Sequence, residues 1–344
     1  MFKQRYNRDT LKSIICLLMN PNWKNFLLSK NALFDNDTDI VFPSPEREGN
    51  KRIYPIAHLG VLTIAGSDAA KFLQGQITCN INDITDIKSS LGALCNPKGR
   101  AITTFLLVKN SDAFLMILPQ ELLASVKKRL QMYVLRSKVT LTDSSDALCL
   151  IGLYDEASQS GEVPEQRFAT SSQENIVVNL QNRNLIIAGA DNAQALWEKQ
   201  VKLGFLSEDS AQWRYLDIIS GIPWLTAETS EEFIPQMLNL DKLGGISFNK
   251  GCYTGQEIVA RTHYLGKAKR EMFLAECDAL ATPEPNSTII DDSTGTEQSV
   301  GKVLYAQNGQ NTCKMLVILQ IFDTNAYNLR LKNHNQDKLI LLTV

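Results

Sequence analysis

The sequence is poor in the residues that most often bind metals. It has 3 histidines and 7 cysteines in 344 residues, and no two cysteines form a C-x-x-C pair. Structural zinc sites and disulfide frameworks need paired cysteines, and an odd count leaves one unmatched. We therefore expect no metal site and no disulfide framework, and we expect a cytoplasmic location, where thiols stay reduced.

Long apolar runs and an excess of one charge are also missing. Because no run approaches the length of a membrane-spanning helix, we expect no contact with a membrane. Lys plus Arg (35) nearly balances Asp plus Glu (37), whereas a nucleic-acid-binding domain is usually basic. The 44% of hydrophobic and 21% of charged residues are typical of a globular protein. We expect a monomer that does not bind nucleic acid directly.

The first residues resemble the start of a signal peptide. Several basic residues precede the apolar run Ile14–Met19, but Asn20-Pro21 ends this run without a small-residue cleavage site. We interpret residues 1–45 as an N-terminal extension that begins as a loose amphipathic lead-in. A true start at Met19 is the alternative.

Residues 46–150 show the pattern of a first α+β unit. We expect a helix capped by Asp68 and another that starts at Pro119. The second helix carries one apolar stripe: Leu122, Val126, Leu130 and Tyr133. The expected strands are 61–65, 91–95, 101–108, 113–118, 138–141 and 148–153. This order of strands and helices is typical of a ferredoxin-like layer.

Two further units are expected after residue 150. Residues 151–267 predict a second α+β unit, with helices capped by Asp191 and Ser207 and strands at 176–178 and 184–188. Residues 268–344 predict a small β-barrel, because short β-like runs alternate with polar turns. These runs are 272–275, 287–290, 301–305, 315–319 and 339–344.

The segment 248–257, Phe-Asn-Lys-Gly-Cys-Tyr-Thr-Gly-Gln-Glu, is the most informative stretch of the chain. Thr254 and Glu257 have the spacing of a capping box, which predicts a helix that starts there. A helix N-terminus and the nearby Lys250 would both favour the thiolate of Cys252, so we predict a reactive or metal-ligating cysteine. The alternatives are a small buried Cys252, a Glu257 that only caps the helix and a Lys250 that is a surface charge.

The octet 250–257 resembles the signature of the YgfZ-type folate-binding proteins, which are relatives of the glycine cleavage system T-protein. Further blocks match the same family in order, over residues from about 50 to the C-terminus. These blocks are Phe72–Thr78, Cys95–Arg100, Phe233–Gln236, Gly244–Phe248, Glu257–Arg261 and Gly266–Arg270.

The resemblance implies a fold, a ligand and a role. The fold is an α+β protein with two ferredoxin-like units and a C-terminal β-barrel, arranged as a three-lobed ring around a central channel. The ligand is tetrahydrofolate or a one-carbon derivative. The role is support of iron–sulfur client enzymes, such as a radical enzyme that methylthiolates tRNA, by assembly or repair.

The family's motif also implies the site residues. It assigns chemistry to Cys252 and Lys250, with no metal ligands. The residues expected to bind the folate are Asn96, Arg100, Tyr253, Gln256, Glu257 and Arg261. Four basic residues farther along can bind the carboxylates of the folate tail: Arg261, Lys267, Lys269 and Arg270. A solvated basic turn is an equally good interpretation of these residues.

Two departures separate this chain from the T-protein. Thr103 and Thr104 stand where the T-protein has two aspartates, one of them catalytic, and a hydroxyl does not replace a carboxylate in proton transfer near pH 7. Ile219 stands where a glutamate can hold the pterin, and Asp217 is the nearest carboxylate. We therefore do not expect glycine-cleavage aminomethyl transfer. A one-carbon transferase with another acceptor is the alternative function, and direct RNA binding is a third hypothesis.

Overall fold

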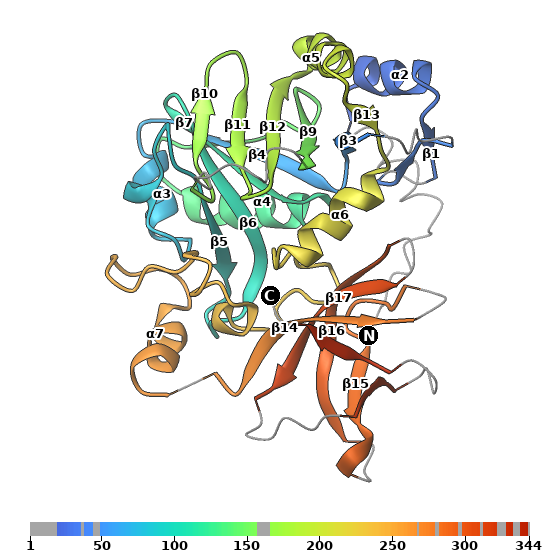
Figure 1. Cartoon of the computed structure of the whole chain (residues 1–344). Helices are drawn as coiled ribbons and strands as arrows, with labels where there is room; N and C mark the ends of the chain where they lie inside the picture. Colours follow the sequence, from blue (N-terminus) through green and yellow to red (C-terminus); the bar gives the residue numbers. More distant parts are fainter. Residues whose placement is uncertain are drawn as a thin grey trace, which may run out of the picture.

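The computed structural model describes most of the chain. The described residues are 19–35, 38–43, 49–156, 166–266, 268–278, 282–294, 298–309, 312–321, 328–332 and 338–342. They form a mixed α+β protein with three large sheets (Figure 1). None of the described helices is both long and apolar enough to cross a membrane.

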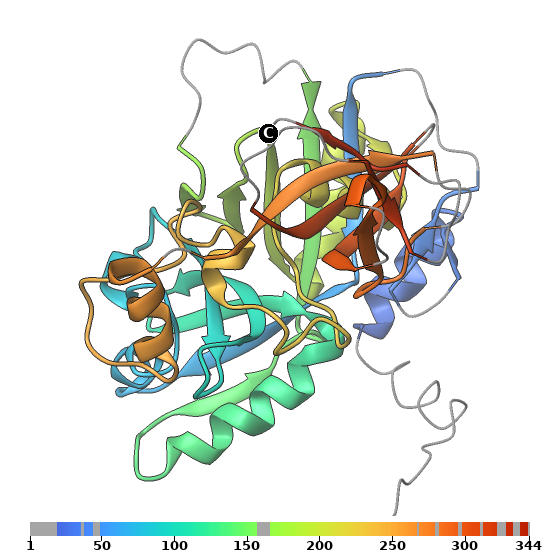
Figure 2. The same ribbon diagram turned by 90° about the horizontal axis from the view of Figure 1, so that it is seen from below.

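The first sheet has the strand order β5-β6-β7-β4-β8, and all its pairs are antiparallel. Figure 2 shows α4 lying along this sheet, where it contacts β4 and β8. The elements are β4 (Leu59–Ala65), α3 (Ala69–Gln74), β5 (Ser90–Cys95), η1 (Ile81–Asp83), β6 (Ala101–Asn110), β7 (Ala113–Pro119), α4 (Gln120–Val134) and β8 (Thr140–Asp143). The predicted strands and both predicted helices of this region are confirmed.

Two details of the prediction for this region are wrong. Tyr133 is 39% exposed, and Val134 completes the buried stripe of α4, because a spacing of four continues the same helix face. Asp68 precedes α3 but gives it no side-chain cap. Its carboxylate instead accepts a hydrogen bond from the backbone N–H of Lys138, at 2.7 Å, and so joins distant segments.

The second sheet has the order β10-β11-β12-β9-β3-β13, in which only the pair β3–β13 is parallel. Its elements are β3 (Lys51–Ile56), β9 (Leu148–Asp155), β10 (Thr170–Ser172), β11 (Ile176–Asn179), β12 (Arg183–Gly189), α5 (Ala190–Lys202), β13 (Leu206–Ser207) and α6 (Ser210–Ile219). Strand β3 thus lies in the second sheet, although it precedes the first sheet in the chain. The division into 1–45, 46–150, 151–267 and 268–344 stays a prediction.

The starts of α5 and α6 differ from the prediction. Gly189 is the N-cap of α5, and Asp191 lies within its first turn. Helix α6 begins after Asp209, two residues later than a cap at Ser207 predicts. The Asp209 carboxylate accepts a hydrogen bond from the backbone N–H of Phe42, at 2.6 Å, and thereby holds the N-terminal segment.

The described part of the N-terminal extension is folded onto the second sheet. Its elements are α2 (Pro21–Ser29), β1 (Leu33–Phe34) and β2 (Ile40–Val41). The Asn20 side chain caps α2, and Trp23 meets Trp197 of α5 edge to face, with ring centroids 5.6 Å apart. The loose lead-in predicted before Asn20 falls on residues 1–18, which lie outside the described residues, so it stays a prediction.

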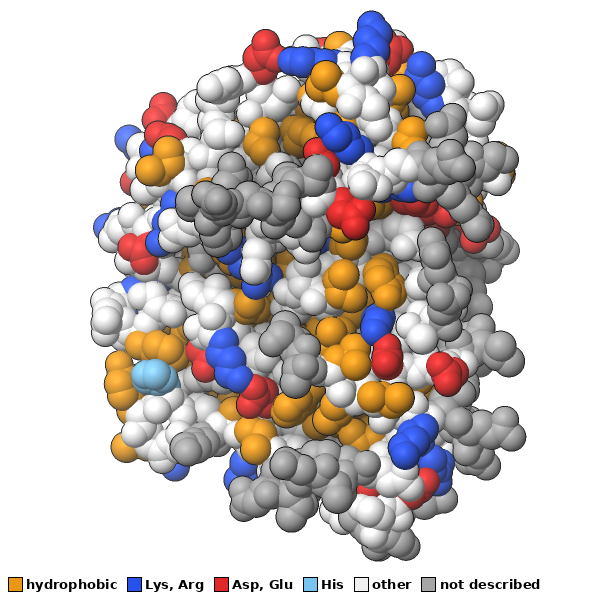
Figure 3. Space-filling view, in the orientation of Figure 1, with side chains coloured by type: hydrophobic (Ala, Val, Ile, Leu, Met, Phe, Trp, Pro, Cys, Tyr) orange, Lys and Arg blue, Asp and Glu red, His pale blue; other side chains and the backbone are white. Residues whose placement is uncertain are grey.

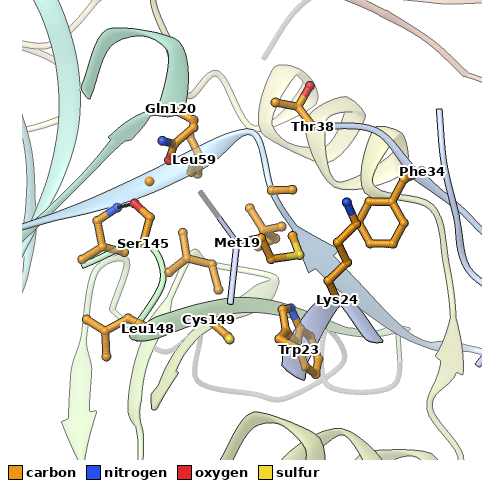
Figure 4. A pocket seen from close by; sticks show the side chains of 15 residues that line it. Met19, Trp23, Lys24, Phe34, Thr38, Leu59, Gln120, Ser145, Leu148 and Cys149 are labelled. Atoms are coloured by element: carbon orange, nitrogen blue, oxygen red, sulfur yellow. Dashed lines mark hydrogen bonds between the residues drawn. The ribbon is translucent and has the colours of Figure 1, made fainter. Parts of the chain in front are cut away.

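A small cavity lies where α2 meets the sheets (Figure 4). Met19 and Trp23 face Leu148 and Cys149 across it, and its volume is about 50 Å³. Pockets for small-molecule ligands usually hold roughly 300–1,000 Å³. This cavity is therefore a packing gap beneath α2, too small for a folate.

The C-terminal sheet is curled and has the order β18-β15-β16-β17-β14-β19. Its strands are β14 (Arg270–Cys277), β15 (Thr288–Asp291), β16 (Ser299–Asn308), β17 (Cys313–Gln320), β18 (Leu329–Leu331) and β19 (Ile340–Leu342), with the short η4 (Asp292–Thr294). Apolar side chains such as Ile289, Val303 and Val317 form a separate core inside the curl. In the chain order, η3 (Pro235–Leu238) and α7 (Gln256–Tyr264) come after α6 and before β14.

A matched pair of leucines in α2 tests whether the N-terminal segment is part of the fold. Leu27 is fully buried and Leu28 is 46% exposed. We expect Leu27→Ala to lower the free energy of unfolding by about 2–5 kcal/mol, because it leaves a cavity. Leu28→Ala should change it by less than about 0.5 kcal/mol. Urea unfolding measures both, and equal small effects would show that α2 is not docked.

Candidate functional site

The side chain of Asn96 stabilises the turn after β5, to which it belongs. The Asn96 side chain is 8% exposed, and its Oδ1 accepts hydrogen bonds from the backbone N–H groups of Lys98, at 2.9 Å, and Arg100, at 3.1 Å. Asn96 therefore shapes this turn from within. Its predicted contact with a folate is not tested.

This turn packs directly against the motif loop, which we define as residues 248–255. Gly255 has a φ of +83°, and a Cβ at this position would lie 2.4 Å from the Asn96 carbonyl oxygen. On the opposite side, a Cβ at Gly99 would lie 2.8 Å from Cβ of Ile258 in α7. Only glycine fits such an approach of two backbones. The two motifs, far apart in sequence, thus form one unit.

Helix α7 does not begin with the predicted capping box. Gly255, in the left-handed conformation, is the N-cap, and no side chain caps the helix. The Gln256 side chain accepts a hydrogen bond from the backbone N–H of Tyr253, at 3.3 Å. Glu257 and Arg261 are exposed on α7, and Tyr253 is buried. The left-handed turn at Gly255 separates Thr254 from the position that a capping threonine must occupy.

Lys250 anchors the motif loop to the segment after α3. Its Nζ donates to the carbonyl oxygens of Ile77, at 2.7 Å, and Cys79, at 2.8 Å. It also lies 5.1 Å from the ring centroid of Tyr253. Burial lowers the pKa of Lys250 from 10.5 to about 8. The alternative of a plain surface charge is therefore wrong for this side chain.

Cys252 is the exposed thiol of the described chain. The other described cysteines are all buried, as predicted: Cys79, Cys95, Cys149, Cys277 and Cys313. Burial raises the pKa values of Cys79, Cys95 and Cys149 to about 12. These thiols stay protonated near neutral pH, so Cys252 is the described thiol best placed to react with a partner from solution.

The two threonines that replace the T-protein aspartates are part of the core. Thr103 and Thr104 are at most 1% exposed. Thr103 donates to the Thr104 carbonyl oxygen at 2.9 Å, and Thr104 donates to the Pro223 carbonyl oxygen. Both hydroxyl protons are thus bound within the protein, and the Thr104 bond ties β6 to the segment after α6.

Asp217 is not free to act in place of the glutamate that the family resemblance implies at position 219. It is 1% exposed and pairs with Arg183 at 2.6 Å, while the indole N–H of Trp224 donates to its other oxygen at 2.9 Å. Nε2 of His58 lies 3.7 Å from the same carboxylate, outside hydrogen-bonding distance. Burial lowers the pKa of His58. Asp217 thus belongs to a buried polar cluster of the core.

A pocket of about 470 Å³ lies where the end of α6 meets β14, and we call it the Ser220 pocket. In the view of Figure 3, apolar side chains gather near the middle of the molecular surface. Leu243, Met272 and Leu274 supply apolar walls. Oδ1 of Asn239 and Nε of Arg167, which also line the pocket, are buried without a hydrogen-bond partner. No sequence motif marks either residue, so neither was predicted as part of a site.

A second open groove, of about 750 Å³, is rich in cations, and we call it the basic groove. Its lining includes Arg100, Lys269, Arg270 and Lys302. The Arg100 guanidinium donates to the carbonyl oxygens of Glu231 and Glu232. Two of the four basic residues that were predicted to bind the folate tail, Lys269 and Arg270, thus line this groove. Arg261 does not line the groove, and Lys267 lies outside the described residues.

A third groove, of about 710 Å³, adjoins the Ser220 pocket, and we call it the aromatic groove. Phe248 stacks on His263 with ring centroids 3.7 Å apart, and Lys88 also lines the groove. It shares Arg167, Lys242 and Leu243 with the Ser220 pocket. Among the described residues, no group of three or more His, Cys, Asp or Glu side chains could hold a metal ion.

Comparison with known proteins identifies the family. The chain is 33% identical over 294 residues to the tRNA-modifying protein YgfZ of Colwellia psychrerythraea, with 82% of this chain and 89% of that protein covered. The chain belongs to the YgfZ family. It is 29% identical to the protein of the same name from Vibrio atlanticus (82% and 84% covered), and 34% identical to that of Photobacterium profundum (65% and 69% covered). No family model matches the chain.

The fold agrees with this membership. The glycine cleavage system aminomethyltransferase T of Bartonella henselae superposes with a TM-score of 0.68, at 12% identity and with 86% of each chain covered. The predicted relationship to YgfZ and to the T-protein fold is confirmed. This member of the YgfZ family therefore has the fold of the T-protein.

Gly255 and Gly251 allow a test of the close approach in the motif loop. Gly255→Ala puts a Cβ against the Asn96 carbonyl at a left-handed φ, so we expect it to cost roughly 1–3 kcal/mol of stability. At Gly251 an added Cβ meets nothing within 4 Å, so Gly251→Ala is the matched control. Chemical unfolding, together with the labelling rate of Cys252, measures the effect. Equal behaviour of the two variants would contradict the packing described.

His58 should make stability depend on pH. Because burial lowers its pKa below 6.5, the unfolded chain binds more protons here, and stability falls as the pH drops through and below 6.5. One such group contributes at most about 1.4 kcal/mol per pH unit. We expect a flatter pH profile of stability for His58→Gln. The control is His263→Gln, since His263 is exposed on α7; an unchanged profile for His58→Gln would contradict the assignment.

Proposed function

We propose that this protein binds a reduced folate, tetrahydrofolate or a one-carbon derivative, and supports the assembly or repair of iron–sulfur enzymes in the cytoplasm. The exposed thiol of Cys252 carries the proposal. A thiolate is both a nucleophile and an iron ligand, so an exposed cysteine on a rigid loop can act on a client protein. Lys250 is a positioning residue in this scheme, since its ammonium group fixes the loop.

The Ser220 pocket suits the folate's pterin ring. Its volume of about 470 Å³ falls within the usual range for small-molecule sites. The apolar walls match a flat ring, and Asn239 and Arg167 add polar side chains to the same lining. Polar groups at a few points of an apolar pocket orient a ligand. These residues would take over from the glutamate that Ile219 replaces.

The finer architecture belongs to the same proposal. Two ferredoxin-like units and the curled C-terminal sheet would form a three-lobed ring, with the folate in its central channel. The Ser220 pocket supports this arrangement, because the turn just after α6, the 239–243 segment and β14 all line it. The predicted folate contacts of Tyr253, Gln256, Glu257 and Arg261 stay part of the proposal, although none of them lines the three grooves described.

The alternative, a one-carbon transferase with an unknown acceptor, has less support. General acid–base work on an amine needs a group that accepts a proton near pH 7. Thr103 and Thr104 are buried and bonded to backbone carbonyls. The effect on tRNA would instead pass through client enzymes, such as a radical tRNA methylthiotransferase, without direct contact with RNA.

Anaerobic calorimetric titration with tetrahydrofolate tests the folate part. We expect binding by the native protein and by Cys252→Ser, which loses only the thiol. Asn239→Ala should weaken binding about tenfold, because it removes a buried hydrogen-bond acceptor. Absence of binding by the native protein would contradict the folate assignment.

The activity of iron–sulfur enzymes in cells that produce each variant tests the thiol part. Cys252→Ser should behave like a deletion, and Gly251→Ala, its unobstructed neighbour, like the native protein. Normal iron–sulfur enzyme activity with Cys252→Ser would remove the thiol from the mechanism. Turnover of methylene-tetrahydrofolate with an amine would favour the transferase instead.

A further inference from the structure

The basic groove brings together cations from three distant parts of the chain. Arg100 follows the turn after β5, Lys269 and Arg270 lie at the start of β14, just before it and at its first residue, and Lys302 lies on β16. Among the described lining residues the one carboxylate belongs to Glu232, which pairs with Lys302 at 3.3 Å. Four cations against one carboxylate leave an excess of positive charge in one groove, on a chain whose net charge is −2.

Two of these cations are held in place by the protein. The carbonyl oxygens of residues 231 and 232 accept from the Arg100 guanidinium, and Glu232 holds Lys302. Such fixed groups lose little conformational freedom when an anion binds. Between the cations lie the apolar side chains of Ile234, Met237 and Ile321. The groove therefore fits a chain that alternates short apolar links with carboxylates.

The basic groove and the Ser220 pocket share two structural segments. Met237 lines the groove and Asn239 lines the pocket, while on β14 Arg270 lines the groove and Met272 the pocket. Two residues of a strand span about 7 Å. A ligand held in the pocket can therefore reach the groove along η3 and β14.

We propose that the basic groove binds the poly-γ-glutamate tail of a folate, so that the protein prefers polyglutamylated folates over the monoglutamate. This inference rests on the proposed folate function and adds the class of folate. Each added γ-glutamate brings one carboxylate and an apolar link of two methylene groups. Among the described residues that line the groove there is no aromatic ring on which a base could stack, which disfavours single-stranded RNA as its occupant.

The aromatic groove is the competing route for the tail. It also adjoins the Ser220 pocket, and Lys88 and Lys242 line it. Arg167 lines it too, and Asp83 is the carboxylate among its described lining residues, so this groove holds three cations where the basic groove holds four. Lys88 therefore offers a matched control, since it is a lysine of the other groove.

The test compares the dissociation constants of tetrahydrofolate monoglutamate and triglutamate, measured anaerobically at low and high salt. Two added carboxylates on partly exposed cations should make the triglutamate bind about 2- to 30-fold tighter. The advantage should shrink as salt screens the charges. In Lys269→Gln/Arg270→Gln the ratio should fall toward one, and in Lys88→Gln it should stay as in the native protein. Lys302→Gln serves as a second groove variant if the double variant does not fold.

The outcomes separate this inference from the proposed function. Equal affinity for the two forms overturns the inference and leaves the folate function standing, whereas no binding of either form overturns both. Loss of the ratio in Lys88→Gln alone would place the tail in the aromatic groove. Binding of tRNA that depends on Lys269 and Arg270, without a triglutamate advantage, would assign the basic groove to nucleic acid and overturn the inference.

Discussion

The contact between two backbones, at Gly99 and Gly255, is the constraint on which the site depends. No Cβ fits at either position, so the turn after β5 and the motif loop lie as close as two chains can. Asn96 stiffens one side from within, and Lys250 fixes the other side through two carbonyl oxygens. Cys252 thus stands exposed on a loop that has little freedom to move. A thiol presented in this way can meet a partner without the entropy loss of ordering a flexible loop.

Thr103, Thr104 and Asp217 lie in the core of the protein. The two threonine hydroxyls bond to carbonyl oxygens. The Thr104 bond joins β6 to Pro223, and therefore steadies the segment that leads from α6 past the Ser220 pocket. Asp217 stabilises the core through Arg183 and Trp224. These three residues therefore serve packing, whereas Cys252 is exposed on the motif loop.

Local sequence patterns predicted most elements of the first and last sheets, because apolar periodicity and turns act over short range. The prediction of a cap at Asp68 failed because this side chain serves a distant partner, the backbone N–H of Lys138. The capping box at Thr254 failed because Gly255 adopts a left-handed conformation. Family motifs identified Cys252 and Lys250, but Asn239 and Arg167 carry no local signal. Only the folded chain brings these two residues to one pocket.

The place of β3 has a consequence for how the chain folds. Lys51 pairs with Asp155, and the whole first sheet lies between these residues in sequence. Strand β3 therefore leaves the ribosome long before β9, its neighbour in the second sheet, and α2 must wait longer still for α5. Contacts of such long sequence separation slow folding, and unpaired strand edges invite wrong partners in the meantime. Completion of the second sheet is thus the step at which early and late parts of the chain become one cooperative structure.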